Sequence, residues 1–177
     1  MDSLRIIPEC FVDTNLVSTL LGGRRVNHQK CCNNVVSLMK GKFCDDFAVG
    51  IIDNDKRRPQ YLDECCKLAE SEHLCLYRHP HKHHYMITIS PAAEGFILSA
   101  AAAAGISMPD YSLPSDLKGL KKITKNMVTS KDPNLVRLFC DLKTVGEFNV
   151  LQNVLEYLLQ SGFSADQNVL VAFFNRH

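Results

Sequence analysis

The chain has 177 residues, of which 46% are hydrophobic and 22% are charged, and its formal net charge is +1. This length suffices for one domain with its own core, and the composition excludes a disordered chain. A net charge near zero also excludes a uniformly basic protein, so contact with nucleic acid would depend on local basic patches.

The cysteines and the apolar stretches indicate a reduced, non-membrane environment. The chain starts Met1-Asp2-Ser3-Leu4, without the basic and apolar pattern of a signal peptide. Two of the cysteine clusters, Cys31-Cys32 and Cys65-Cys66, are vicinal pairs rather than the Cys-x-x-Cys of redox or zinc sites. The longest apolar stretch, Phe96–Ile106, is far shorter than the ~20 residues of a spanning helix. We therefore expect a cytoplasmic protein that does not enter a membrane.

The first ninety residues alternate predicted strands with predicted helices. In chain order, the pattern predicts a strand at Leu4–Ile7, helices at Asp13–Leu21 and Asn27–Met39, a strand at Phe47–Ile52, a crossover helix at Gln60–Ala69, and strands at Leu74–Tyr77 and Tyr85–Ile89. The near-continuous apolar run at Phe47–Ile52 is typical of a strand buried on both faces. The histidine-rich segment Arg78–His84 is interpreted as a solvated loop, with a metal site as the alternative.

The second half of the chain is predicted to be helical. Helices are expected at Ala92–Ala104, Leu117–Met127, Pro133–Leu142 and Phe148–Leu159, and the segment Asn168–Phe174 fits a helix or a strand. These elements predict an α/β fold with a mainly parallel central sheet flanked by helices. We expect residues 1–106 to form this core and residues 107–177 to form a helical extension packed on it, within one domain.

Acidic residues follow two of the predicted strands. Glu9 and Asp13 come after the first strand, and Asp53 and Asp55 come after the second. In α/β sheets, ligands bind beyond the carboxyl ends of the strands. Converging carboxylates repel one another unless a cation neutralises them, and their hard oxygens favour Mg²⁺ or Mn²⁺. Such a site supports phosphoryl transfer or phosphodiester cleavage. In the alternative interpretation, Asp13 is a helix N-cap and Asp53-Asn54-Asp55 is a polar turn.

The acidic segments resemble the motifs of the Toprim family. Glu9-Cys10-Phe11-Val12-Asp13 has the spacing of the Toprim glutamate motif, and Asp53-Asn54-Asp55 resembles its Asp-x-Asp. The stretch from Ser90 to Leu98 is similar to the Pro-x-x-Glu-x-Trp-Leu-Leu segment of small OLD-like Toprim proteins, with Glu94 at the glutamate. The resemblance spans residues 4–100 and implies a Toprim-like sheet.

The same resemblance implies an acidic metal centre and phosphodiester chemistry. It assigns Mg²⁺ or Mn²⁺ ligands to Glu9, Asp53, Asp55 and Glu94, with Asp13 completing the catalytic set. A lysine of the helical part that stabilises the reacting phosphate is expected by similarity to OLD-type enzymes. Lys122 and Lys125 are both candidates for that lysine. As an alternative, Glu94 is a first-turn glutamate that interacts with its helix dipole.

Basic residues near the acidic motifs are candidates for binding nucleic acid. Lys56, Arg57 and Arg58 directly follow the second acidic motif, while Lys118 and Lys121 belong to a helical run of lysines. A solvated helix face is the alternative explanation of that run.

The predicted function is Mg²⁺-dependent cleavage of nucleic acid, with DNA favoured over RNA. The resemblance to OLD-like proteins suggests the role of an effector in phage defence. The chain has no Gly-rich phosphate loop, so an ATPase partner would be encoded separately. One alternative is a non-catalytic Toprim-like module that binds a partner through Val169–Phe174 if that segment is exposed. A further alternative is a PIN-like ribonuclease, because Phe11–Val17 resembles the opening of PIN domains.

Overall fold

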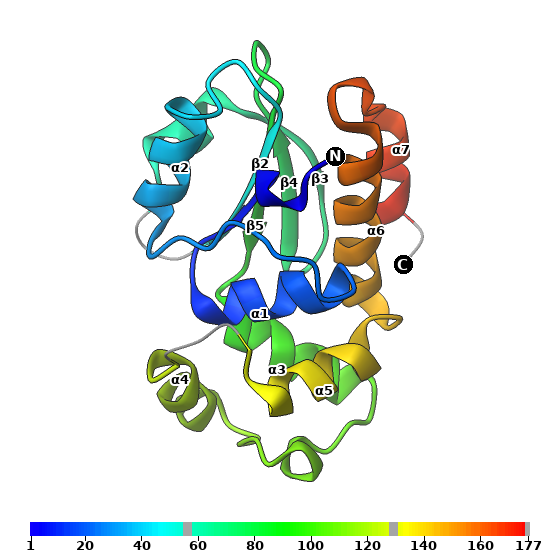
Figure 1. The fold of residues 1–177 in the computed structure, drawn as a ribbon. Helices are drawn as coiled ribbons and strands as arrows, with labels where there is room; N and C mark the ends of the chain where they lie inside the picture. The colour runs from blue at the N-terminus through cyan, green and yellow to red at the C-terminus, as the bar shows by residue number, and fades with distance from the viewer. Residues whose placement is uncertain (55–57, 128–130, 176–177) are drawn as a thin grey trace.

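The computed structural model describes residues 1–54, 58–127 and 131–175. Its centre is a five-stranded sheet in the order β1-β2-β5-β4-β3 (Figure 1). The strands are β1 (Ile6–Pro8), β2 (Ala48–Asp53), β3 (Cys66–Glu70), β4 (Leu74–Arg78) and β5 (His84–Ile89). β1, β2 and β5 run parallel, whereas β4 and β3 are antiparallel to their neighbours. The α/β class is therefore confirmed, but the sheet is mixed and its parallel part is limited to three strands.

Seven α-helices in the described ranges surround this sheet. They are α1 (Phe11–Leu20), α2 (Cys32–Lys40), α3 (Ala93–Ala103), α4 (Leu117–Lys125), α5 (Pro133–Leu142), α6 (Gly146–Ser161) and α7 (Gln167–Phe174). A large hydrophobic core joins one face of the sheet to side chains of α1, α3, α5, α6 and α7, so the C-terminal helices share the core of the sheet. A smaller core on the other face involves α2 (Figure 1). No helix in the described ranges is both long and apolar enough to cross a membrane.

The central strand β2 is buried on both faces, as its apolar sequence predicts. Val49 and Ile51 belong to the larger core, while Ala48 and Ile52 belong to the smaller one. This alternation follows from the two-residue period of a strand. β2 therefore holds the two layers of helices on opposite sides of the sheet.

Gly50 allows α2 to lie close to the central strand. A Cβ atom at this position would lie 2.6 Å from Met86 Sδ, 2.8 Å from Met39 Sδ and 2.9 Å from Val35 Cγ1. Since Val35 and Met39 belong to α2, the missing side chain makes room for this helix.

The prediction of a crossover helix at Gln60–Ala69 is wrong. This segment contains a short 3-10 helix, η2 (Gln60–Glu64), followed by the edge strand β3. The Leu, Ala and Glu residues of the segment are good helix formers, but pairing with β4 gives the backbone its hydrogen-bond partners in a hairpin. The tertiary pairing therefore overrides the local propensity.

The N-terminal elements are shorter than the sequence predicts. Leu4 and Arg5 belong to a 3-10 turn, so β1 begins only at Ile6. The predicted helix Asn27–Met39 begins only at Cys32, because the residues before it lie alongside β1 and form hydrogen bonds with it. In that stretch, the Asn27 N–H donates to the Ile6 carbonyl at 2.9 Å.

Two further predictions depend on segments that form helices. Phe11 and Val12 begin α1, which removes the strand that a PIN-type site would need before its first aspartate. Val169–Phe174 lies within α7, where Leu170 and Phe174 are buried. Val169 is 37% exposed and Val171, Ala172 and Phe173 are half-buried, so the segment exposes part of its apolar surface and partner binding through it stays a prediction.

Glu147 connects the first turn of α6 to the turn between β3 and β4. Its Oε1 accepts hydrogen bonds from the Ser71 hydroxyl and, at 2.9 Å, from the His73 backbone N–H. Its Oε2 lies 2.6 Å from His73 Nδ1. Burial alone would raise the pKa of Glu147, but these hydrogen bonds outweigh it and hold the pKa below its usual value.

We predict that Glu147→Gln lowers the free energy of unfolding at neutral pH by roughly 1–3 kcal/mol. Because the folded-state pKa of Glu147 is depressed, its carboxylate contributes stability above the pKa of the unfolded chain. This contribution is lost as the pH falls through the folded-state pKa. Urea unfolding of both proteins across the acidic range should therefore show curves that converge at low pH. Glu72→Gln, an exposed neighbour, is the matched control; a constant difference at every pH would contradict the prediction.

Candidate acidic site

Three parallel strands bring the predicted acids to one edge of the sheet. β1, β2 and β5 are adjacent and end at this edge. Glu9 follows β1, Asp53 is the last residue of β2, and Glu94 lies in the first turn of α3 after β5. Asp13 lies in the first turn of α1. Figure 1 shows α1, α3 and α4 together below the sheet, at this end of the parallel strands.

Asp13 is a buried carboxylate rather than a helix cap. The N-cap of α1 is Cys10, whose Sγ accepts a hydrogen bond from the Asp13 backbone N–H at 3.5 Å. The Asp13 side chain has no exposed surface, and neither of its carboxylate oxygens has a hydrogen-bond partner among the described residues. Burying a carboxylate without hydrogen-bond partners lowers the stability of the fold, so the presence of Asp13 at this position requires an explanation.

Asp53 connects β1, β2 and α3. Its backbone N–H donates to Glu9 Oε2 at 3.2 Å, and its Oδ1 accepts a hydrogen bond from the Ala93 N–H at 3.0 Å. The second bond satisfies a free N–H at the start of α3. The carboxylate of Asp53 thus has a structural partner and still belongs to the acidic cluster.

Glu94 is fixed by a residue of α4. The Thr124 hydroxyl donates to Glu94 Oε1 at 2.5 Å, and both side chains are largely buried. Sequence analysis missed Thr124. The sequence does contain an indication: Thr124 is a polar residue four positions after Leu120, so it lies on the apolar side of a helix whose other side carries lysines.

The four acids influence one another electrostatically. Burial, together with the nearby charges of Glu9 and Glu94, raises the pKa of Asp13 to about 7, and the adjacent Cys10 thiol works against this increase. Burial also raises the pKa of Asp53 to about 8, with contributions from Asp13, Glu9 and Glu94. Burial and the neighbouring Asp13 raise the pKa of the Cys10 thiol as well. The cluster therefore favours protons or a cation over four free negative charges.

The carboxylate oxygens of the four acids are the right type of ligand atom for a hard divalent cation, but they are not arranged as a complete set of ligands. In the described part of the chain, no group of three or more His, Cys, Asp or Glu side chains is arranged to hold a metal ion. The carboxylate oxygens are nevertheless those that Mg²⁺ and Mn²⁺ prefer, and the oxygens of Asp13 are buried without partners. Cation binding would require side chains such as Glu9 to change their contacts.

Two lysines of α4 line a cavity together with two of the four acids. The cavity has a volume of about 690 Å³, and its lining includes Asp53, Glu94, Lys121 and Lys125. Of the two lysines predicted to stabilise phosphate, only Lys125 lines it. Lys122 belongs to a different hollow, which it shares with Asp132, and Lys118 also does not line the acidic cavity.

Of the basic residues predicted to follow the second acidic motif, only Arg58 belongs to the described residues. Lys56 and Arg57 lie outside them, as does the predicted metal ligand Asp55. Arg58 forms an ion pair with Asp63 at 3.4 Å, and its guanidinium lies 5.7 Å from the centre of the Tyr77 ring. These contacts keep Arg58 beside η2 and β4.

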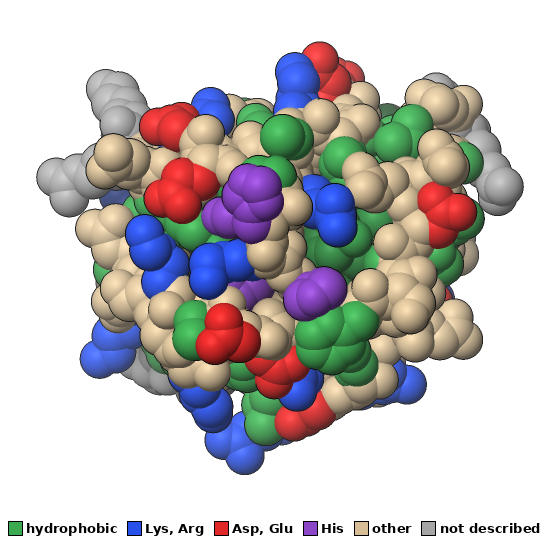
Figure 2. Space-filling model, turned by 90° about the horizontal axis from the view of Figure 1, so that it is seen from above, with side chains coloured by type: hydrophobic (Ala, Val, Ile, Leu, Met, Phe, Trp, Pro, Cys, Tyr) green, Lys and Arg blue, Asp and Glu red, His purple; other side chains and the backbone are tan. Residues whose placement is uncertain are grey.

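The histidine-rich segment lies at the opposite end of β5 from the acids. Figure 2 shows this end, where histidines lie among side chains of both charges. Pro80, His81 and His83 are exposed in a loop between β4 and β5, as predicted, but the flanking His79 and His84 are buried. His84 lies between the Tyr61 hydroxyl, 2.5 Å from Nδ1, and the Phe43 carbonyl, 2.8 Å from Nε2. Burial lowers the pKa of His84, which suits this structural role.

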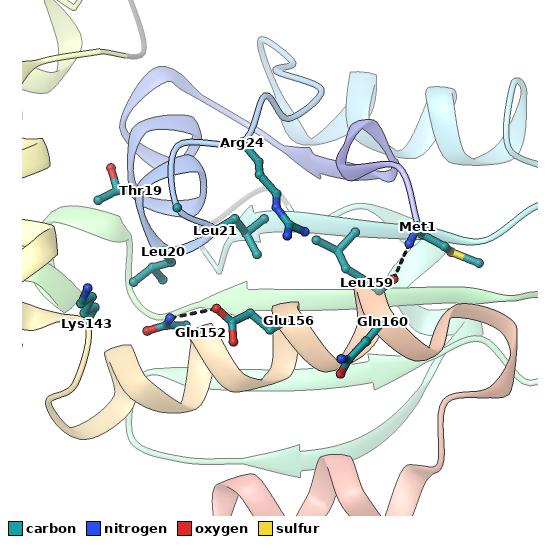
Figure 3. Close-up of a pocket in the computed structure, with 11 residues that line it drawn as sticks. Met1, Thr19, Leu20, Leu21, Arg24, Lys143, Gln152, Glu156, Leu159 and Gln160 are labelled. Atoms are coloured by element: carbon teal, nitrogen blue, oxygen red, sulfur yellow. Dashed lines mark hydrogen bonds between the residues drawn. The ribbon is translucent and has the colours of Figure 1, made fainter.

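A separate cavity of about 590 Å³ lies between the C-terminal end of α1 and α6 (Figure 3). Two hydrogen bonds border it: the terminal amine of Met1 donates to the Leu159 carbonyl at 2.8 Å, and Gln152 Nε2 donates to Glu156 Oε1 at 2.9 Å. Asp53 and Glu94 line the cavity beside α4, and none of the four acids lines this one.

Neither the models of known protein families, nor the curated proteins, nor the solved structures contain a match to this chain. The interpretation of the acidic site therefore depends on its geometry and chemistry.

We predict that Asp13→Asn raises the free energy of unfolding at pH 8 in the presence of a chelator by roughly 1 kcal/mol or more, because it removes a buried negative charge. Urea unfolding measures this change. The same substitution should remove any stabilisation that millimolar Mn²⁺ or Mg²⁺ gives the wild type. Asp141→Asn is the matched control, since this exposed carboxylate only accepts a hydrogen bond from Tyr111. A destabilised Asp13→Asn protein that still gains stability from Mn²⁺ would contradict the prediction.

Proposed function

We propose that this protein cleaves phosphodiester bonds of nucleic acid with the help of Mg²⁺ or Mn²⁺. The observation that carries the proposal is the convergence of four carboxylates at the end of three parallel strands, where two of them, Asp53 and Glu94, line one cavity with two lysines. A site for phosphoryl chemistry needs this combination, because the acids can hold a cation and the lysines can hold the polyanion.

In this proposal, Glu9, Asp13, Asp53 and Glu94 hold the cation. Asp55 follows in the same segment but lies outside the described residues. The cation, when bound, would neutralise the acids, activate water and stabilise the leaving oxygen. The buried Asp13 then receives the partner that its two carboxylate oxygens lack among the described residues. This need for a positive partner is the reason to favour a metal site over a purely structural cluster.

The helix α4 supplies residues that bind the phosphate groups of the substrate and orient one of the acids. Lys121 and Lys125 are four positions apart on α4, so their ammonium groups can contact neighbouring phosphate oxygens. Between them in sequence, Thr124 holds Glu94 by its hydroxyl. α4 therefore connects phosphate binding to the position of one acid. We infer a Toprim-like activity from the order of the acidic motifs along the chain.

We predict that Asp53→Asn reduces cleavage of labelled DNA to background in the presence of Mn²⁺ or Mg²⁺. The asparagine oxygen can still accept the Ala93 N–H, so the start of α3 should keep its hydrogen bond. Circular dichroism and urea unfolding check the fold. Single-stranded and duplex DNA and RNA should be tested in parallel, since the substrate determines which assay reports activity. Undiminished cleavage by a folded Asp53→Asn protein would refute the acidic centre.

A second prediction separates the lysines of α4 from one another. Lys125→Gln should lower the cleavage rate by about 100-fold, because it removes a positive group from the cavity that contains the acids. Lys118→Gln is the matched control on the same helix, and its rate should stay close to that of the wild type. Equal losses in both variants would indicate a diffuse charge effect and contradict a specific role for Lys125.

A further inference from the structure

A cavity beside the start of α1 combines two stacked rings with basic side chains. Its volume is about 510 Å³, which lies within the usual range of small-ligand pockets. The residues that carry the argument are Phe11, Thr14, Arg25, His28 and Lys131, all of which line it. None of these residues has a role in the acidic site described above.

The rings of Phe11 and His28 stack on each other and form a fixed pair, so a base can stack only on an outer face of this pair. Their centres are 4.2 Å apart and their planes differ by 7°. The Thr14 hydroxyl donates to the Cys10 carbonyl at 2.6 Å, so its oxygen can accept a hydrogen bond from His28 Nδ1 at 2.9 Å. This chain of hydrogen bonds fixes the orientation of the imidazole. Burial lowers the pKa of His28 and favours the neutral ring.

The cavity has the chemistry of a site for a base with an attached phosphate. Flat aromatic side chains bind nucleobases by stacking, which depends little on the identity of the base. Arg25 is exposed at the cavity, and Lys131 lines it as well. Guanidinium and ammonium groups bind phosphate oxygens.

The cavity and the acids are separated by the first turn of α1. Phe11, Thr14 and Ser18 line the cavity and share one side of the helix because their spacing is three and four residues. Asp13 lies on the other side, buried near Cys10 and Asp53. Phe11 is only two residues after Glu9. A nucleic-acid strand bound at the acidic site can therefore extend past the start of α1 to the rings of Phe11 and His28.

We propose that an unpaired base of a single-stranded nucleic acid stacks on an outer face of the Phe11–His28 pair, with Arg25 beside its phosphate. The proposal rests on the proposed function, since it supplies the neighbouring subsite for the same strand. A free nucleotide also contains a base and a phosphate, so the experiment has to distinguish a free nucleotide from a single-stranded nucleic acid.

The absence of tryptophan from the chain permits a direct test. Phe11→Trp introduces one indole at the cavity, and its fluorescence should fall when a base stacks on it. The protein, carrying Asp53→Asn as well, is titrated in a chelator with a single-stranded deoxyadenylate oligomer, with an oligomer of abasic residues and with dAMP. Phe163→Trp is the matched control, because Phe163 is 50% exposed and contacts His83, 4.7 Å between ring centres, near the histidine-rich end of the molecule.

We expect the deoxyadenylate oligomer to quench the indole of Phe11→Trp and to leave that of Phe163→Trp unchanged. The abasic oligomer and dAMP should quench far less. In a protein without tryptophan, Phe11→Leu should weaken binding of a fluorescent oligomer by roughly tenfold, measured by anisotropy in the chelator. Phe163→Leu should bind as the wild type does.

Three results would overturn the proposal. Absence of quenching in a folded Phe11→Trp protein excludes base stacking at this cavity. Equal quenching by the abasic oligomer means that phosphate alone binds, and equal quenching by dAMP assigns the cavity to a free nucleotide. The titrations use Asp53→Asn protein in a chelator, so their outcome does not depend on cleavage. Cleavage is tested separately on the protein without substitutions, with Mn²⁺ or Mg²⁺. Stacking in the titrations together with no cleavage in that assay would refute the proposed cleavage and leave the base site intact.

Discussion

The position of the central strand β2 is the constraint on which the rest of the structure depends. It is buried on both faces and pairs in parallel with β1 on one side and β5 on the other. Parallel pairing forces the three strands to end at one edge, so the segments that follow them must start there. α1 and α3 begin at this edge and bring their first-turn acids together.

Packing against the larger core then fixes these helices. Leu16 and Val17 of α1 and Ile97 of α3 are fully buried, so neither helix can rotate to release its acid into solvent. Asp13 consequently stays enclosed despite the cost of a buried carboxylate. The apolar core thus sustains a local electrostatic repulsion, which a proton or a cation relieves.

The two proposed sites lie on either side of the first turn of α1. On one side, the acids and the lysines of α4 combine negative and positive groups for phosphate chemistry. On the other side, Phe11 and His28 form a stacked pair of rings, and Thr14 fixes the orientation of the imidazole. Reaction and recognition would therefore depend on one short segment, Glu9–Thr14, whose conformation is set by the Cys10 cap.

The sequence by itself determined the strong local signals. The apolar run of β2, the acids at the ends of strands, and most helices of the second half follow from periodicity, since a buried face repeats with the geometry of its element. Tertiary structure decided what depends on partners distant in sequence. Cys66–Glu70 became a strand because β4 satisfies its backbone, and His84 became buried because Tyr61 and Phe43 satisfy its ring. Likewise, the helical pattern presents four lysines on α4, and only the docking of that helix against Glu94 through Thr124 selects Lys121 and Lys125 to face the acids.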